Sequence, residues 1–101
     1  MDFAIKEGEV THVTLNGKLD FARAPVLMEA LSELKDKEIS SIVFGCASLS
    51  YISSSGIRAI IFAQQKIAPN MKVVMEDVNE EVAEVLEMCG ITDFIEVTGS
   101  Q

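Results

Sequence analysis

The sequence contains few of the residues on which metal centres and disulfide frameworks depend. Its 101 residues include two cysteines, one histidine, one tyrosine and no tryptophan. Cys46 and Cys89 lie far apart and form no CxxC pair, so neither a zinc site nor a structural disulfide is indicated. We expect both cysteines to be small buried hydrophobic residues, and we expect no metal and no cofactor.

Long apolar runs are also missing. No stretch approaches the roughly 18 apolar residues that a membrane span needs, and the opening MDFAIKEGEV does not resemble a signal peptide. We therefore expect a cytoplasmic protein with no membrane insertion. Because 49% of the residues are hydrophobic, there is enough apolar material for one core, and residues 1–101 are expected to form a single domain.

Positive charge is scarce, above all towards the C-terminus. Eight Lys and Arg residues against sixteen Asp and Glu residues give a formal net charge of −8. Half of the acidic residues follow Lys72, whereas no lysine or arginine does. Such a surface repels phosphate backbones and anionic lipids, so nucleic acid is excluded as an expected partner. We interpret the acidity as a solvated face without a catalytic role.

Short apolar segments alternate with segments of helical spacing. In VTHVTL, Thr11, Val13 and Leu15 share one face of a strand. The continuous apolar run SIVFGC (41–46) predicts a strand that is covered on both faces. The predicted strands are residues 3–7, 10–15, 41–46, 72–75 and 94–97, and the predicted helices begin at Pro25, near Ser55 and at residue 80. This order predicts an α/β fold, with helices packed against a mixed β-sheet of four to five strands.

Turn and capping residues bound these elements. The segment NGKLDFARA (16–24) opens with an Asn-Gly turn signal and is expected to be a loop. Pro69-Asn70 should end the middle helix, which we expect to reach Ile67. Asn79 can cap the last helix, and Gly90 can end it. The inner face of that helix is expected to hold Val82, Val85, Leu86 and Cys89.

The segment YISSSGI places three serines where a strand turns into a helix. Backbone N–H groups at a helix start point outward, and with the helix dipole they favour an anion. A serine there can cap the helix, or it can carry a phosphate that the helix end stabilises. Gly56 lets another group approach the backbone closely.

Three catalytic interpretations of these serines fail. A P-loop needs a lysine after its glycines, and none lies near. A nucleophile elbow at Ser55 needs glycines where Ser53 and Ile57 stand. A Ser–His pair would have to recruit His12, which nothing in the sequence places there. We therefore expect no enzymatic activity.

Three further segments stand out: LNGKLDFARAP (15–25), SIVFGCASLSYISSSGI (41–57) and VNEEVAEVLEMCGITDFIEV (78–97). Taken in order and at their separations, they resemble the STAS domain family of sulfate transporters and anti-sigma factor antagonists. The similarity is to its small free-standing antagonists and covers nearly the whole chain. The resemblance implies a STAS-like fold and a regulatory protein that binds an anti-sigma factor.

The resemblance also assigns roles to particular residues. Ser55, directly before Gly56, falls on the family's phosphoacceptor serine, Ser54 on the first serine of its Ser-Ser pair, and Asp20 on the acidic residue after the second strand. It implies a switch in which an anti-sigma factor acting as serine kinase inactivates the protein by phosphorylation and a phosphatase resets it. The implied partner-binding residues are Asp20, Ser53, Ser54, Gly56, Arg58 and Phe62.

The sequence departs from the family pattern at two positions. Gly45 and Ser53 stand where the family usually has aspartate. Ser53 can still cap the helix, and this capping role explains the third serine. The alternative to phosphorylation of Ser55 is a capping cluster that carries no modification.

The helix after the serines offers a second surface. Arg58, Phe62 and Lys66 follow one another at i, i+4 spacing. An aromatic residue between two cations suits contact with an acidic partner. The alternative is that Phe62 packs under the neighbouring helix. The inward positions are expected to be Ile57, Ile60, Ile61 and Ile67.

Two functions from different classes remain beside the antagonist. The first is a non-catalytic STAS adaptor subunit of a larger assembly, such as a lipid-transport ABC complex. The second is a nucleotide or small-anion binder that uses the same helix end. For each of these functions we expect a monomer or a weak dimer.

Overall fold

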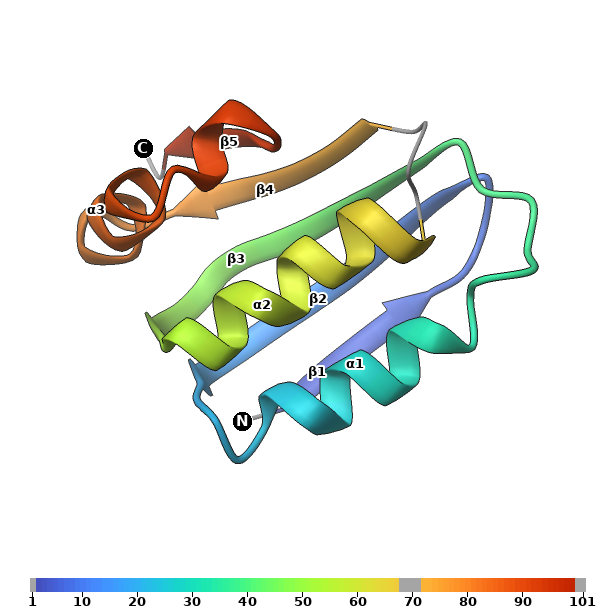
Figure 1. Ribbon diagram of the computed structural model, residues 1–101, viewed down its shortest axis with the longest axis horizontal. Coiled ribbons are helices and arrows are strands. Elements are labelled where there is room, and N and C mark those ends of the chain that lie inside the picture. The colour runs from blue at the N-terminus through green and yellow to red at the C-terminus, as the bar shows by residue number, and fades with distance from the viewer. Residues whose placement is uncertain (1, 68–71, 100–101) are drawn as a thin grey trace.

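The computed structural model describes residues 2–67 and 72–99. Its elements are β1 (Asp2–Lys6), β2 (Val10–Leu19), α1 (Ala24–Ser32), β3 (Ser41–Ile52), α2 (Ser54–Phe62), a π-helical turn (Ala63–Ile67), β4 (Lys72–Val78), α3 (Glu80–Met88), a 3-10 turn (Ile91–Asp93) and β5 (Glu96–Gly99). The sheet has the order β1-β2-β3-β4-β5 (Figure 1). β1 is antiparallel to β2, and the other neighbours are parallel. The predicted α/β fold with a mixed sheet is confirmed.

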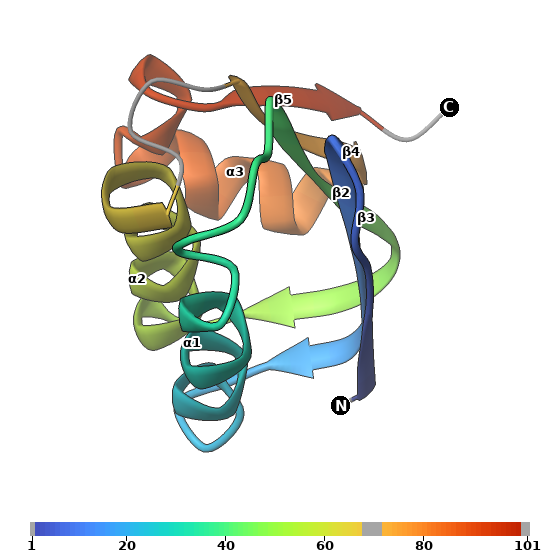
Figure 2. The same ribbon diagram turned by 90° about the vertical axis from the view of Figure 1, so that its right-hand side faces the viewer.

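All three helices lie on the same face of the sheet (Figure 2). The parallel strands follow one another across the sheet in one direction, and crossovers of one hand then place every helix on one side. The prediction that residues 41–46 are covered on both faces is therefore wrong. Ile42, Phe44 and Cys46 are buried under the helices, whereas Val43 and Gly45 are half-buried on the opposite face.

β2 and β3 are longer than the sequence pattern predicted. β2 continues through residues 16–19, which we expected to be loop, and β3 continues to Ile52. The pairing shifts register twice, between Thr14 and Asn16 and between Gly17 and Lys18. Both strands bend here, and their ends turn towards the side of the sheet on which α1 and α2 lie (Figure 2). A bulge breaks the two-residue alternation by which a strand is recognised, so the pattern ended early.

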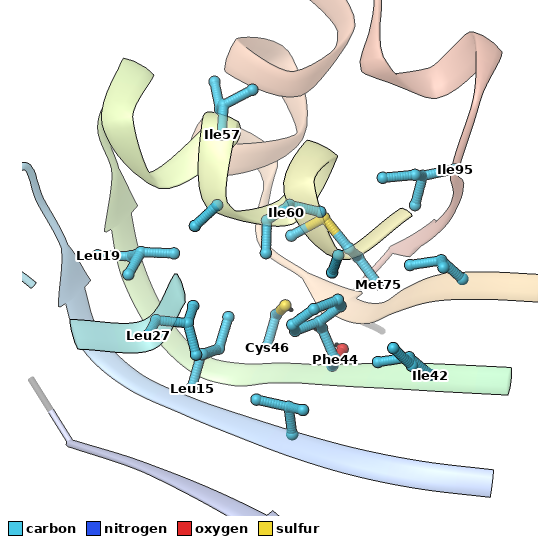
Figure 3. Close-up of a cluster of buried hydrophobic side chains, with 14 of the residues drawn as sticks. Leu15, Leu19, Leu27, Ile42, Phe44, Cys46, Ile57, Ile60, Met75 and Ile95 are labelled. Carbon is cyan, nitrogen blue, oxygen red and sulfur yellow. Dashed lines mark hydrogen bonds between the residues drawn. The ribbon is translucent and has the colours of Figure 1, made fainter. Parts of the chain in front are cut away.

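The core lies between the bent sheet and the helices (Figure 3). Phe44 and Cys46 of β3 lie below Ile60 of α2, and Leu19 of β2 lies near Leu27 of α1. Ten core side chains are labelled in that view: Leu15, Leu19, Leu27, Ile42, Phe44, Cys46, Ile57, Ile60, Met75 and Ile95. The serine-bearing end of α2 is thus anchored from below by packed apolar side chains.

The two cysteines differ in environment. Cys46 is buried as predicted, and burial, with smaller contributions from Asp77 and Glu76, raises its pKa to about 12. Cys89 is exposed, so the prediction that it lies on the inner face of the last helix is wrong. α3 ends at Met88, and the chain turns away at Cys89 and Gly90 before Ile91 enters the core.

The ends of α3 agree with the sequence. The Asn79 side-chain oxygen accepts a hydrogen bond of 2.8 Å from the Val82 amide, as a helix cap does. Gly90 has a φ of 73°, the left-handed conformation that glycine adopts most easily after a helix. Of the predicted inner face, Val82 and Leu86 are buried and Val85 is half-buried. Pro69-Asn70, the predicted end of the middle helix, lies outside the described residues.

Asn79 also ties α3 to the sheet, which gives a stability prediction. Its side-chain nitrogen donates a hydrogen bond of 3.0 Å to the Leu49 carbonyl oxygen. We expect Asn79→Ala to lower the free energy of unfolding in urea by about 2 kcal/mol, through loss of a cap and of this bond. Asn79→Asp should keep the cap and recover part of the loss. Equal losses for the two variants would contradict a capping role.

Cys46 predicts a pH dependence of stability at alkaline pH. Below the ordinary thiol pKa of 9.0, folded and unfolded chains both hold the proton. Above it the unfolded chain loses the proton while the folded chain keeps it up to about pH 12, so the free energy of unfolding falls as pH rises through this window. Denaturant titrations of Cys46→Ala should show a smaller fall, and Cys89→Ser should behave like the wild type.

Candidate functional site

The candidate site is the serine turn, residues 53–56, where β3 passes into α2. The Ser53 amide and hydroxyl both donate to the Leu19 carbonyl oxygen, at 2.9 and 3.2 Å. The same hydroxyl accepts a hydrogen bond of 3.1 Å from the Gly56 amide and caps α2. A hydroxyl can donate and accept, whereas a carboxylate can only accept. Serine therefore suits this position better than the aspartate that the family resemblance implies.

Gly56 is required by packing within the chain. A Cβ at this position would lie 2.7 Å from the Leu19 carbonyl oxygen and 2.8 Å from Cγ1 of Ile52. The sequence correctly predicted a close approach at Gly56. The groups that approach are Leu19 and Ile52, which form a cross-strand pair at the ends of β2 and β3. Gly56 thus sets the height of α2 above the sheet.

Ser54 and Ser55 are the first two residues of α2. Ser54 is exposed and Ser55 is half-buried, so both lie at or near the surface, as expected. The first amides of a helix have no partner within it, and they favour an anion at this end. Arg58 is exposed one turn after Ser55, on the neighbouring position of the same helix face. A phosphate on Ser55 would therefore lie near the helix end and within reach of a cation.

Asp20 lies at the same end of the sheet, because it follows Leu19, the strand partner of Ile52. One carboxylate oxygen of Asp20 accepts a hydrogen bond of 3.0 Å from the Arg23 amide. The Asp20 carbonyl oxygen accepts a further bond of 2.9 Å from the Ala24 amide at the start of α1. Asp20 therefore shapes the turn into α1, and its other lone pairs stay available to a partner.

Phe21 was missed by the sequence interpretation. It follows Asp20 in this turn, and 75% of its surface is exposed. A large aromatic residue in a polar turn directly before Pro25 was the signal available in the sequence. We include Phe21 in the candidate contact surface, since exposed aromatic side chains are common anchors in protein interfaces.

Phe62 and Lys66 do not share one exposed helix face in the structure. Phe62 is half-buried and packs against the core, which agrees with the alternative that the sequence left open. Lys66 lies in the π-helical turn after α2, so the i, i+4 spacing from Phe62 no longer describes one face. Gly45 pairs with Thr14 and Glu76 in the middle of the sheet and is not part of the serine turn.

Within residues 2–67 and 72–99, no group of three or more His, Cys, Asp or Glu side chains is placed to hold a metal ion. Among the helices that the structure describes, none has the length and apolar character needed to cross a membrane.

Because of the close approach at Gly56, we expect replacement of this helical glycine by alanine to destabilise the protein. Replacing a helical glycine by alanine normally stabilises by about 1 kcal/mol. Here we expect Gly56→Ala to lower the free energy of unfolding by about 2 kcal/mol, because the new Cβ overlaps Leu19 and Ile52. Gly45→Ala is the control, since its Cβ would meet the Thr14 hydroxyl at an unstrained 3.9 Å. Urea denaturation should separate the two variants, and equal stabilities would contradict this packing argument.

Comparison with solved structures places this geometry among known folds. SpoIIAA in its unphosphorylated form, an anti-sigma factor antagonist, superposes with a TM-score of 0.74 at 15% identity over 99% of this chain and 89% of that one. A putative antagonist from Thermotoga maritima gives 0.84 at 18% identity, covering 97% and 86%. An antagonist from Mycobacterium paratuberculosis gives 0.84 at 13% identity, covering 96% and 84%. At these identities the similarity shows the fold.

None of the curated protein sequences compared with this chain matches it. The STAS domain family, in contrast, matches residues 4–100, from the first strand of the sheet to beyond the last. The match includes the serine turn, the Asp20 turn and α3. The chain therefore belongs to the STAS domain family.

Proposed function

We propose that this protein is an anti-sigma-factor-antagonist-like regulator that binds an anti-sigma factor and is switched by phosphorylation of Ser55. The observation that carries the proposal is the position of Ser55, half-buried at the start of α2 and flanked by the exposed Ser54 and Arg58. The STAS family membership and the fold of the solved antagonists support it. The chain acts by binding, without catalysis of its own.

The unmodified protein offers a compact contact surface at this end of the molecule. Ser54, Ser55 and Arg58 project from α2, while Asp20 and Phe21 project from the turn after β2. Both segments are fixed to one another through the Leu19 carbonyl oxygen and the Ser53 hydrogen bonds. A partner therefore meets a preformed surface and loses little free energy in ordering it.

Phosphorylation changes this surface while leaving its support in place. A phosphate adds about −1.5 to −2 charges and three acceptor oxygens. The N-terminal amides of α2 and the side chain of Arg58 stabilise these oxygens locally, so the fold persists. A partner that packs against the Ser55 hydroxyl then meets added bulk and negative charge that Arg58 neutralises only in part. The partner also loses its contact with the Arg58 side chain, because the phosphate now occupies that cation.

The enzymes that set the switch are a serine kinase, which is the anti-sigma factor itself, and a phosphatase that restores the hydroxyl. Solved structures of SpoIIAA exist in the unphosphorylated and the phosphorylated form, and both share the fold of this chain. The alternative function is that of an adaptor subunit in a larger assembly such as a lipid-transport ABC complex. An adaptor would be captured with transporter subunits whatever the state of Ser55.

Mass spectrometry and binding measurements test the switch. On protein isolated from its native cells, we expect phosphate on Ser55 and not on Ser53, whose hydroxyl is engaged with Leu19 and Gly56. Ser55→Asp should keep the melting temperature of the wild type, because an acidic residue in the first turn of a helix is tolerated. It should weaken binding to the captured partner by about 2 kcal/mol or more, measured by calorimetry.

Two variants provide the controls. Ser55→Ala should bind the partner normally and resist inactivation, while Ser54→Ala should remain open to phosphorylation. Wild-type affinity in Ser55→Asp, or phosphate found on Ser53 or Ser54 alone, would refute the assignment. If wild type and Ser55→Asp captured transporter subunits equally, the result would favour the alternative function of an adaptor subunit.

A further inference from the structure

The face of the sheet opposite the helices, here called the open face, carries a cross-strand row with an ordered charge pattern. The strand registers align Lys6 with His12, His12 with Val43, Val43 with Val74, and Val74 with Glu96. The row therefore begins with a cation on β1, is apolar on β3 and β4, and ends with an anion on β5. Figure 2 shows that no helix lies over this face.

Gly45, at the centre of the open face, is not required by the packing of the residues that the structure describes. An added Cβ would have Thr14 Oγ1 at 3.9 Å as its near neighbour, which is ordinary contact. Glycine weakens a strand by roughly 0.5–1 kcal/mol relative to alanine. In strand interiors it often marks a place where another backbone or a ligand approaches closely. The room for a Cβ at Gly45 therefore points to an approach from outside the chain.

The charge of the open face indicates which kind of partner approaches it. The protein carries a formal charge of −8, so most of its surface repels a second copy of itself. The described side chains of the open face differ, because Lys6 and Lys72 balance Glu76 and Glu96. Self-association therefore meets less electrostatic repulsion on this face than on the acidic surface that includes α3.

We propose that the open face binds a second copy of this chain across a two-fold axis that runs along β3. β3 is the central strand of the five, so this axis places β1 of each copy over β5 of the other. Lys6 then faces Glu96 of the second copy, twice by symmetry, and Val43 meets Val43. Gly45 faces its own counterpart and lets the two sheets approach to the usual spacing of about 10 Å.

The dimer that this geometry gives is weak. The open face holds three rows of side chains across the five strands, fewer than the roughly 20–30 residues per partner of a standard interface. It leaves the serine turn free, because that turn lies beyond the bend in β2 and β3 on the helix side of the molecule (Figure 2). The proposal does not rest on the proposed switch, and Ser55→Asp should leave dimerisation unchanged.

Charge reversal with rescue tests the pairing in the full chain. Sedimentation equilibrium from about 1 μM to about 1 mM should show a reversible monomer–dimer equilibrium for the wild type. Lys6→Glu and Glu96→Lys should each weaken dimerisation by at least about tenfold, and the double variant should recover most of the loss. Glu96 also contacts Lys72 within one chain, at 3.5 Å. Glu96→Lys removes that contact, and adding Lys6→Glu cannot restore it. Recovery of dimerisation in the double variant therefore identifies the pairing between the two copies. Lys35→Glu, an exposed change of equal charge elsewhere, is the matched control for Lys6→Glu.

Gly45→Asp tests the position of the axis. It places two carboxylates opposite each other in the dimer, so we expect dimerisation to be lost while circular dichroism and the melting temperature show a folded monomer. Gln65→Glu is the control with the same change of one charge at an exposed site. A wild type that stays monomeric throughout this range, a double variant as weak as the single ones, or a Gly45→Asp dimer of unchanged affinity would overturn the proposal.

Discussion

The carbonyl oxygen of Leu19 holds the two segments of the candidate site together. It accepts two hydrogen bonds from Ser53 and lies against the backbone of Gly56, so the end of β2 fixes the start of α2. Asp20 follows directly and begins the turn into α1. One backbone group thus determines where the serine hydroxyls, the Asp20 carboxylate and the Phe21 ring stand relative to one another.

This arrangement separates the chemistry of the site from the stability of the fold. Ser53 and Gly56 face inward and are occupied by hydrogen bonds and packing, whereas Ser54 is exposed and Ser55 half-buried. The two inner residues therefore keep the turn in place while the two others meet solvent or a partner. Repeated modification of a hydroxyl is compatible with such a turn, because the modified group is not one that holds the helix.

The sequence predicted those features that depend on local physics. Asn79 caps α3, Gly90 ends it in the left-handed region, and Ser53 caps α2. Each of these depends on a residue and its neighbours within one turn of helix. The position of Ser55 at the start of α2 was predicted for the same reason.

Features that depend on contacts between distant segments were missed. The continuation of β2 and β3 past their apolar runs depends on a register shift between the two strands, which neither strand encodes alone. The open face follows from the hand of three crossovers, and no single strand pattern reveals it. Lys66 and Cys89 were misplaced because a π-helical turn and a helix end change the spacing on which their assignments depended.

The strand order has a consequence for how the chain acquires its structure. Every pair of neighbouring strands in the sheet is also consecutive along the chain. Each strand can therefore pair with one already made, and each loop that closes spans a hairpin or one helix, which keeps the entropy lost at every step small. During synthesis, the growing chain can add one strand at a time to an existing edge without waiting for a distant segment. Folding in the order of translation is thus available to this sheet from its first hairpin onward.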